Sequence, residues 1–139
     1  MTGSTAIFWP MIAHVFLVYC VYYLLSRNRQ KAVMQGSAKV EQFRANQKEP
    51  AESQFARNNL ENQFELPTLF HGACIALYVT GAASLVPVLI AWAFVVSRYA
   101  HSYIHIRTNR IRHRRPLFIA GFVANGLLWV WLAVHIAAN

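Results

Sequence analysis

Long apolar runs dominate the sequence, and they are long enough to cross a membrane. Three stretches, at 6–26, 66–97 and 116–139, contain no Asp, Glu, Lys or Arg. About 20 apolar residues in a helix span a hydrocarbon core of roughly 30 Å. The second stretch is broken at 81–87 by a glycine and a proline, so it should belong to two helices. The pattern therefore predicts four transmembrane helices near 6–26, 62–82, 86–108 and 116–137.

The same pattern predicts the fold class, an all-α integral membrane four-helix bundle. A β-barrel is disfavoured because the apolar runs are continuous rather than alternating. The first run has no basic residues before it, and no small-residue cleavage site precedes Arg27. It is also too long for the core of a signal peptide, so we expect it to be a retained anchor.

Composition changes this picture only through the positions of the charges. The 139 residues are 56% hydrophobic and 13% charged, and 13 Lys and Arg against 5 Asp and Glu give a net charge of +8. An excess of basic residues can indicate a protein that binds nucleic acid. Here, however, all basic residues except Arg98 fall at 27–57 or 107–115, beside the predicted spans. Such residues mark the cytoplasmic side and attract anionic lipid. We therefore expect both termini on the non-cytoplasmic side and no nucleic-acid partner.

The polar segment between the first two spans should contain little structure of its own. We expect a short interfacial helix around Ala38–Gln47. Pro50 suits the first position of a further helix. That helix should start in the cytosol and run unbroken over 51–82, with a bend at Pro67 in its interior.

Polar residues at membrane depth fall on one face of each of two helices. At 100° per residue, Asn58, Asn62 and Glu65 share a narrow face of the second span. The polar face of the third span holds Arg98, His101, Ser102, His105 and Asn109. Polar residues at this depth are costly, which makes them functional candidates by default.

Arg98 should meet Glu65, in the same subunit or in a neighbour. Such a pair could simply hold the helices together. Several more donors converge on the same cytoplasmic half, however, namely Asn62, His101, His105 and the basic cluster at 110–115. Cations and amides in excess suit an anionic ligand with carboxylates, which Arg binds in bidentate fashion.

The histidines do not predict a metal site. His101 and His105 have the i,i+4 spacing of metal ligands, but no carboxylates surround them and Arg98 is close, so we expect no metal. His14 lies toward the outer half of the first span and is expected to be a packing or interfacial residue.

Two motifs on this framework resemble the MAPEG family, the membrane-associated proteins of eicosanoid and glutathione metabolism. The segment Asn62-Gln-Phe-Glu65-Leu-Pro67 is similar to that family's Asn-x-x-Glu motif followed by a proline. The segment from Arg98 to His105 resembles its Arg-x-x-His-x-x-x-Tyr motif, and the basic entry into the last span is also similar. The resemblance covers about 6–133 and implies a single domain over 1–139.

The resemblance implies a homotrimer that binds glutathione as co-substrate between neighbouring subunits, at the cytoplasmic ends of the helices. Asn62 and Glu65 would hold the tripeptide backbone, and Arg98 would pair with Glu65. Arg114, or Arg112 in a shorter loop register, would lie near the thiol. The other implied contacts come from the same motifs: Asn58, where members often carry an Arg, His101, and His105, which takes the Tyr position.

The resemblance implies a glutathione-dependent transferase or peroxidase acting on lipophilic electrophiles, and we expect it in a bacterial inner membrane. The alternative is a non-enzymatic protein of the same fold that binds a lipid or a partner, and Asn58 in the Arg position favours it. A small multidrug exporter is a third class, but it needs an acidic residue in the first span, which this sequence lacks.

Overall fold

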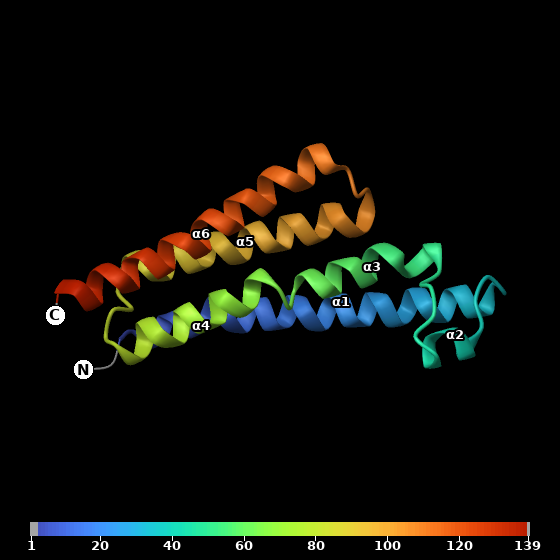
Figure 1. Cartoon of the computed structure of the whole chain (residues 1–139), viewed down its shortest axis with the longest axis horizontal. Helices are drawn as coiled ribbons and strands as arrows, with labels where there is room; N and C mark the ends of the chain where they lie inside the picture. The colour runs from blue at the N-terminus through green and yellow to red at the C-terminus, as the bar shows by residue number, and fades with distance from the viewer. Residues whose placement is uncertain (1–2, 139) are drawn as a thin grey trace.

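The computed structural model describes residues 3–138, and all the regular secondary structure in that range is helical. In Figure 1, α1 lies alongside α3 and α4 in one layer, and α5 pairs with α6 in the other. The start of α1 and the end of α6 lie at one end, and α2 lies at the opposite end. The elements are the 3-10 turn η1 (Thr5–Ile7), α1 (Phe8–Met34), α2 (Val40–Arg44), α3 (Ala51–Asn62), α4 (Leu66–Val79), α5 (Leu85–Arg107) and α6 (Ile111–Ala138).

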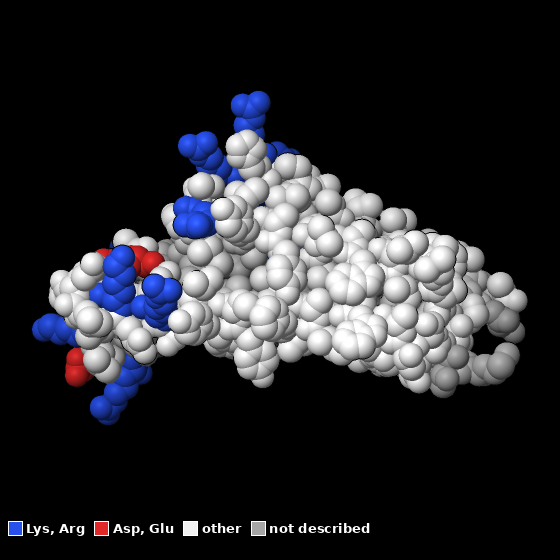
Figure 2. All heavy atoms as spheres, turned by 180° about the vertical axis from the view of Figure 1, so that it is seen from behind, with Lys and Arg blue, Asp and Glu red and all other residues white. Residues whose placement is uncertain are grey.

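Three segments of the described chain are long and apolar enough to cross a membrane: Thr5–Met34, Leu85–Arg107 and Ile111–Ala138. Figure 2 shows Lys and Arg gathered at one end of the molecule, while the rest of that face carries no charged residue. The charges therefore separate along the long axis, as expected for a chain whose apolar length lies in hydrocarbon.

The second expected span is interrupted, which corrects the prediction of one unbroken helix over 51–82. α3 ends at Asn62, and α4 begins only at Leu66. The amides of Gln63 and Phe64 bond three residues back, to Leu60 and Glu61, which tightens and closes α3. Pro67 explains the break, because it has no N–H and its ring would collide with the carbonyl four residues earlier. Instead it takes a place in the first turn of α4, where proline is tolerated.

α1 continues past the expected boundary at Ser26, out to Met34. It ends where Gly36 adopts a positive φ of 74°, a conformation that glycine reaches without strain. α2 follows within the range expected for the short interfacial helix. α6 starts five residues before the expected position, with Pro116 inside it, because Asn109 turns the chain at φ 49°.

One buried carboxylate ties this polar end together. Glu49 accepts hydrogen bonds from Arg29 at 2.8 and 2.7 Å and from Ser53, and Arg57 lies 3.4 Å away. Burial by itself would raise the pKa of the Glu49 carboxyl. The hydrogen bonds from Arg29 and Ser53 and the charges of Arg29 and Arg57 outweigh it and hold that pKa below its ordinary range. Glu49 thereby links α1 to α3.

The apolar core lies between the layers, where the rings of Phe70 and Phe94 stack with centroids 4.2 Å apart. α5 and α6 approach closely at Gly121, where a Cβ would meet the hydroxyl oxygen of Ser97 at 2.8 Å. Small residues allow such close approach of membrane helices. This packing places Arg98, the next residue of α5, against the other layer of the bundle.

Candidate functional site

Arg98 lies inside the bundle with its side chain fully buried. Its Nη2 donates to the backbone carbonyl oxygen of Asn62 at 3.1 Å and to Oε1 of Gln63 at 3.4 Å. Its Nε and Nη1 have no hydrogen-bond partner among the described residues. Buried donors without partners are rare and costly. Arg98 is therefore the polar group in this bundle that most needs a further acceptor.

The break between α3 and α4 supplies the acceptor that Arg98 does have. In an unbroken helix, the carbonyl of Asn62 would accept the amide of Leu66, four residues on. Because α3 ends at Asn62, that carbonyl is available to Arg98 instead. The proline-driven break thus positions the guanidinium.

The structure does not pair Arg98 with Glu65 inside one chain, which corrects the first of the two predicted arrangements. Glu65 is exposed, and none of the ion pairs among the described residues joins it to Arg98. The buried face of this segment consists of Ala56, Asn59 and Gln63, one position removed from the predicted stripe at Asn58, Asn62 and Glu65. Pairing of Glu65 with Arg98 of a neighbouring subunit stays a prediction.

Gln63 is the centre of a buried hydrogen-bond network that the sequence reasoning missed. Its Oε1 accepts from Arg98 and lies 3.1 Å from Nε2 of His14. Its Nε2 lies 3.0 Å from both Oδ1 of Asn59 and Oγ of Ser102. One side chain in the helix break therefore links α1, α3 and α5.

His14 is part of this network, which corrects its expected role as a packing or interfacial residue. The side chain is buried, and its Nδ1 lies 3.1 Å from Nε2 of His71 in α4. The signal was present in the sequence, because His14, Gln63 and His71 are polar residues within or beside apolar runs. Their mutual contact could not be read from one helix at a time.

The two histidines of α5 behave differently from one another. Nδ1 of His105 lies 3.3 Å from Nδ2 of Asn59, so His105 is held in the network. Both ring nitrogens of His101 are buried without a partner among the residues described. His101 therefore has unused hydrogen-bonding capacity, close to His105 and with its ring against Phe118.

A cavity of about 240 Å³ opens beside His101, between α3, α5 and the start of α6. Its lining consists of Asn62, His101, Ile111, Arg114, Arg115 and Phe118. The lining carries two guanidinium groups and no carboxylate, so its charge suits an anion. Arg114 is half-buried there, and its Nη1 donates to Oδ1 of Asn109 at 2.6 Å.

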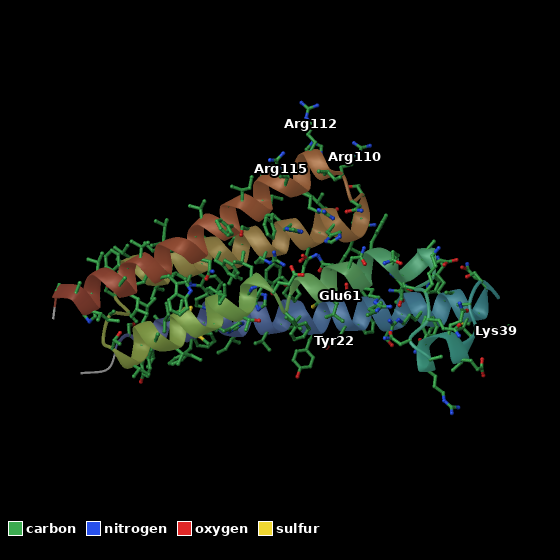
Figure 3. The ribbon with its side chains drawn as sticks, in the orientation of Figure 1. Tyr22, Lys39, Glu61, Arg110, Arg112 and Arg115 are labelled. Atoms are coloured by element: carbon green, nitrogen blue, oxygen red, sulfur yellow. The ribbon has the colours of Figure 1, made fainter. Side chains whose placement is uncertain are left out.

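Three of the candidate site residues thus meet at one cavity, namely Asn62, His101 and Arg114. Arg112, the alternative to Arg114, is exposed, and Figure 3 shows its side chain pointing away from the bundle. Asn58 is half-buried and accepts a hydrogen bond from Gln54 at 2.7 Å. Within the described chain, no group of three or more His, Cys, Asp or Glu side chains could hold a metal ion.

Comparison with known proteins adds a family to this geometry. The MAPEG family model matches residues 7–134 of the chain. The chain belongs to the MAPEG family. No curated protein and no solved structure matches it.

In this MAPEG protein, the two motifs of the sequence contact each other through the helix break. The first motif contributes the carbonyl of Asn62 and the side chain of Gln63, and the second contributes Arg98. Asn58 stands where family members often carry an arginine. The residue before it, Arg57, forms ion pairs with Glu61 at 3.1 Å and with Glu49 at 3.4 Å. Arg98 and Arg114 are both at least half-buried, and neither belongs to an ion pair among the described residues.

Proposed function

We propose that this MAPEG protein is a glutathione-dependent transferase or peroxidase acting on lipophilic electrophiles that reach it from the membrane. One observation carries the proposal. Asn62, His101 and Arg114 line a common cavity without carboxylates, next to a buried Arg98 whose Nε and Nη1 have no partner within residues 3–138. Glutathione carries two carboxylates and two amide groups, which match cationic and amide donors. Family membership supports the same substrate.

The proposed chemistry is attack by the glutathione thiolate on the electrophile. Arg114 stabilises the thiolate over the thiol by Coulomb attraction, which is strong where water is excluded. In transfer, the thiol proton goes to water, sulfur bonds the electrophilic carbon, and the leaving group departs with the bonding electron pair. In peroxide reduction, sulfur bonds the terminal oxygen as the O–O bond breaks and the alkoxide takes a proton, and a second glutathione then displaces hydroxide to give the disulfide and water. Asn62, His101 and Arg98 position the tripeptide. Arg112 is the less suitable thiolate partner because its side chain points away from the bundle.

We further propose a homotrimer with four membrane crossings per subunit and both termini outside the cytoplasm, in a bacterial inner membrane. α4 would be the remaining crossing, although its 14 residues form the shortest of the apolar helices. At about 1.5 Å per residue it covers only some 21 Å, so residues around the break must complete the crossing. The exposed Glu65 leaves a carboxylate that a neighbouring subunit could contact.

Direct binding and turnover measurements test this function. Detergent-solubilised protein should bind glutathione in a calorimetric titration and conjugate it to a chlorinated nitroaromatic compound. Arg112→Leu should retain both properties, whereas Arg114→Leu should bind glutathione but lose most of the turnover. Absence of glutathione binding to the unmodified protein would reject the proposal.

A non-enzymatic lipid- or partner-binding role is the second candidate. Arg57 forms ion pairs with Glu49 and Glu61, so it does not substitute for the arginine that Asn58 replaces. This favours the non-enzymatic role. Ligands that bind the folded state raise its melting temperature. A thermal-shift comparison therefore separates the two roles: glutathione should stabilise an enzyme, and fatty acids alone should stabilise a lipid-binding protein.

A further inference from the structure

A second cavity lies at the basic end of the bundle, between α1, α2 and α3. Its volume is about 670 Å³. Ligand sites typically fall between about 300 and 1,000 Å³. Its lining shares no residue with the cavity at Asn62 and Arg114. Three charged side chains line it beside apolar walls, namely Arg29, Arg57 and Glu61. We call this cavity the Arg29–Arg57 groove.

One buried carboxylate holds the two guanidinium groups of the groove side by side. Nη2 of Arg29 lies 2.7 Å from Oε2 of Glu49, and Nη1 of Arg57 lies 3.4 Å from the same oxygen. The Arg29 guanidinium also lies over the ring of Phe43 in α2, 5.0 Å from its centroid. Both cations are therefore positioned before a ligand binds, which lowers the entropic cost of binding.

Each charged side chain of the groove keeps one polar atom free. Nη1 of Arg29 and Nη2 of Arg57 have no hydrogen-bond partner among the described residues, and 33% and 29% of these side chains is exposed. Glu61 accepts the Nε–H of Arg57 at Oε1, 3.1 Å away, and its side chain is 60% exposed. Within residues 3–138, Oε2 of Glu61 has no partner. The groove thus offers two donors and one anionic acceptor, and together with Glu49 its charges cancel.

The groove lies at the level of a phospholipid headgroup. Tyr22 and Leu25 line it and belong to the charge-free run 6–26, and Arg29 lies one helical turn past Leu25. Figure 3 shows Tyr22 on α1 and Glu61 on the neighbouring α3. Basic pockets between membrane helices bind phospholipid head groups. Because the charges of this pocket cancel, the complementary headgroup is zwitterionic rather than anionic.

We propose that the Arg29–Arg57 groove binds a bilayer phospholipid with a phosphoethanolamine headgroup. The phosphate accepts from Nη1 of Arg29 and Nη2 of Arg57, since guanidinium groups fit phosphate oxygens. The ammonium group donates to Oε2 of Glu61, and the acyl chains follow Tyr22 and Leu25 into the hydrocarbon. The proposal does not depend on glutathione, because the two cavities are separate.

Phospholipids that share their acyl chains but differ in headgroup test the proposal. Native mass spectrometry of the full chain in non-ionic detergent counts bound lipids and chains, and a titration gives the affinity for the first lipid. Phosphatidylethanolamine should bind about three- to tenfold more tightly than phosphatidylglycerol, which has no ammonium, and than phosphatidylcholine, whose ammonium has no N–H. That ratio corresponds to one net hydrogen bond. Palmitate, titrated in parallel, should bind more weakly than phosphatidylethanolamine.

Variants assign the preference to the groove. Glu61→Gln removes the partner of the ammonium and leaves one net positive charge, so phosphatidylglycerol should bind at least as tightly as phosphatidylethanolamine. Glu41→Gln is the matched control, because Glu41 is exposed at the same end but does not line the groove, and it should keep the preference. Arg57→Lys keeps a cation for Glu49 but has no second terminal nitrogen. All three phospholipids should therefore bind it about three- to tenfold more weakly. The comparison of lipids on the unmodified chain needs no variant, so misfolding of a variant does not remove the test.

Five results would overturn the proposal. These are equal affinity for phosphatidylethanolamine and phosphatidylglycerol, a preference that survives in Glu61→Gln, unweakened binding to Arg57→Lys, tighter binding of palmitate than of phosphatidylethanolamine, and loss of oligomers in Arg57→Lys. Tighter binding of palmitate would assign the groove to a fatty acid, and loss of oligomers would assign it to a second copy of the chain.

Discussion

Nη2 of Arg98 lies 3.1 Å from the backbone carbonyl oxygen of Asn62, at the point where α3 ends. The contact joins the two motifs of the chain through a carbonyl that a continuous helix would have used internally. It satisfies only part of the guanidinium, because Nε and Nη1 stay unpartnered within the described residues. Because the Arg98 side chain has no exposed surface in the single chain, a ligand carboxylate or Glu65 of a neighbour would reach these atoms only if the neighbouring side chains move.

Replacing Arg98 should remove function without unfolding the protein. Arg98→Leu replaces a buried cation with an apolar side chain, and such replacement of buried charges is often neutral for stability. Loss of a buried charged partner of a ligand costs about 2–5 kcal/mol, so glutathione-dependent activity should fall at least about 30-fold. Steady-state assays and melting curves measure the two effects. Arg112→Leu is the exposed control, and activity of Arg98→Leu within threefold of the unmodified protein would contradict the assignment.

Mixed oligomers can locate the partner of Arg98. Glu65→Gln and Arg98→Leu should each abolish glutathione-dependent activity. If Glu65 pairs with Arg98 of a neighbour, a complex containing both variants regains one intact pair, formed by Glu65 of one subunit and Arg98 of the other. Co-expressed variants should then recover about a third of the activity per mixed trimer, because one of three interfaces is restored. Activity no higher than that of the separate variants would reject pairing between subunits.

Pro67 should control the geometry of the site from outside it. In Pro67→Ala the new amide can bond Gln63, the helix can continue, and the carbonyl of Asn62 returns to the amide of Leu66. Arg98 would lose an acceptor, and the Kd for glutathione should rise about tenfold or more. Hydrogen exchange at the Leu66 amide should slow as the helix closes. Pro87→Ala, in the first turn of α5, is the matched control, and unchanged exchange and affinity in Pro67→Ala would contradict this account.

Stability should depend on pH through Glu49. Its pKa is held below the ordinary value of 4.5, so the folded state favours the carboxylate more than the unfolded chain does. That contribution is complete above pH 4.5 and is lost as the pH falls through the lowered pKa. Glu49→Gln should reduce stability at pH 7 by about 2 kcal/mol, since charged hydrogen bonds are broken.

The difference in melting temperature between the unmodified protein and Glu49→Gln should therefore shrink as the pH is lowered from 7 toward 3. Glu41→Gln, in the exposed α2, controls for the general loss of a carboxylate. A difference that stays constant across this range would show that Glu49 does not act through its charge.

The site was only partly predictable from the sequence. Arg98 could be found because a charge within an apolar run is expensive, and His101 and Asn62 followed from helical spacing. Gln63 and His14 were missed although both are polar. Spacing alone placed Asn58, Asn62 and Glu65 on one face, whereas the structure buries Asn59 and Gln63. Periodicity gives angles within a helix but not the rotation of that helix against its neighbours.

The sequence by itself determined the helical class, the apolar lengths, the concentration of basic charge at one end and the family, because each depends on residue types and their order along the chain. Tertiary structure decided which polar atoms meet. Pro67 ended α3, and the interruption freed the carbonyl of Asn62 and brought Gln63 against His14, Arg98 and Ser102. Those contacts depend on where four helices stop and how they pack, and no single helical pattern contains that information.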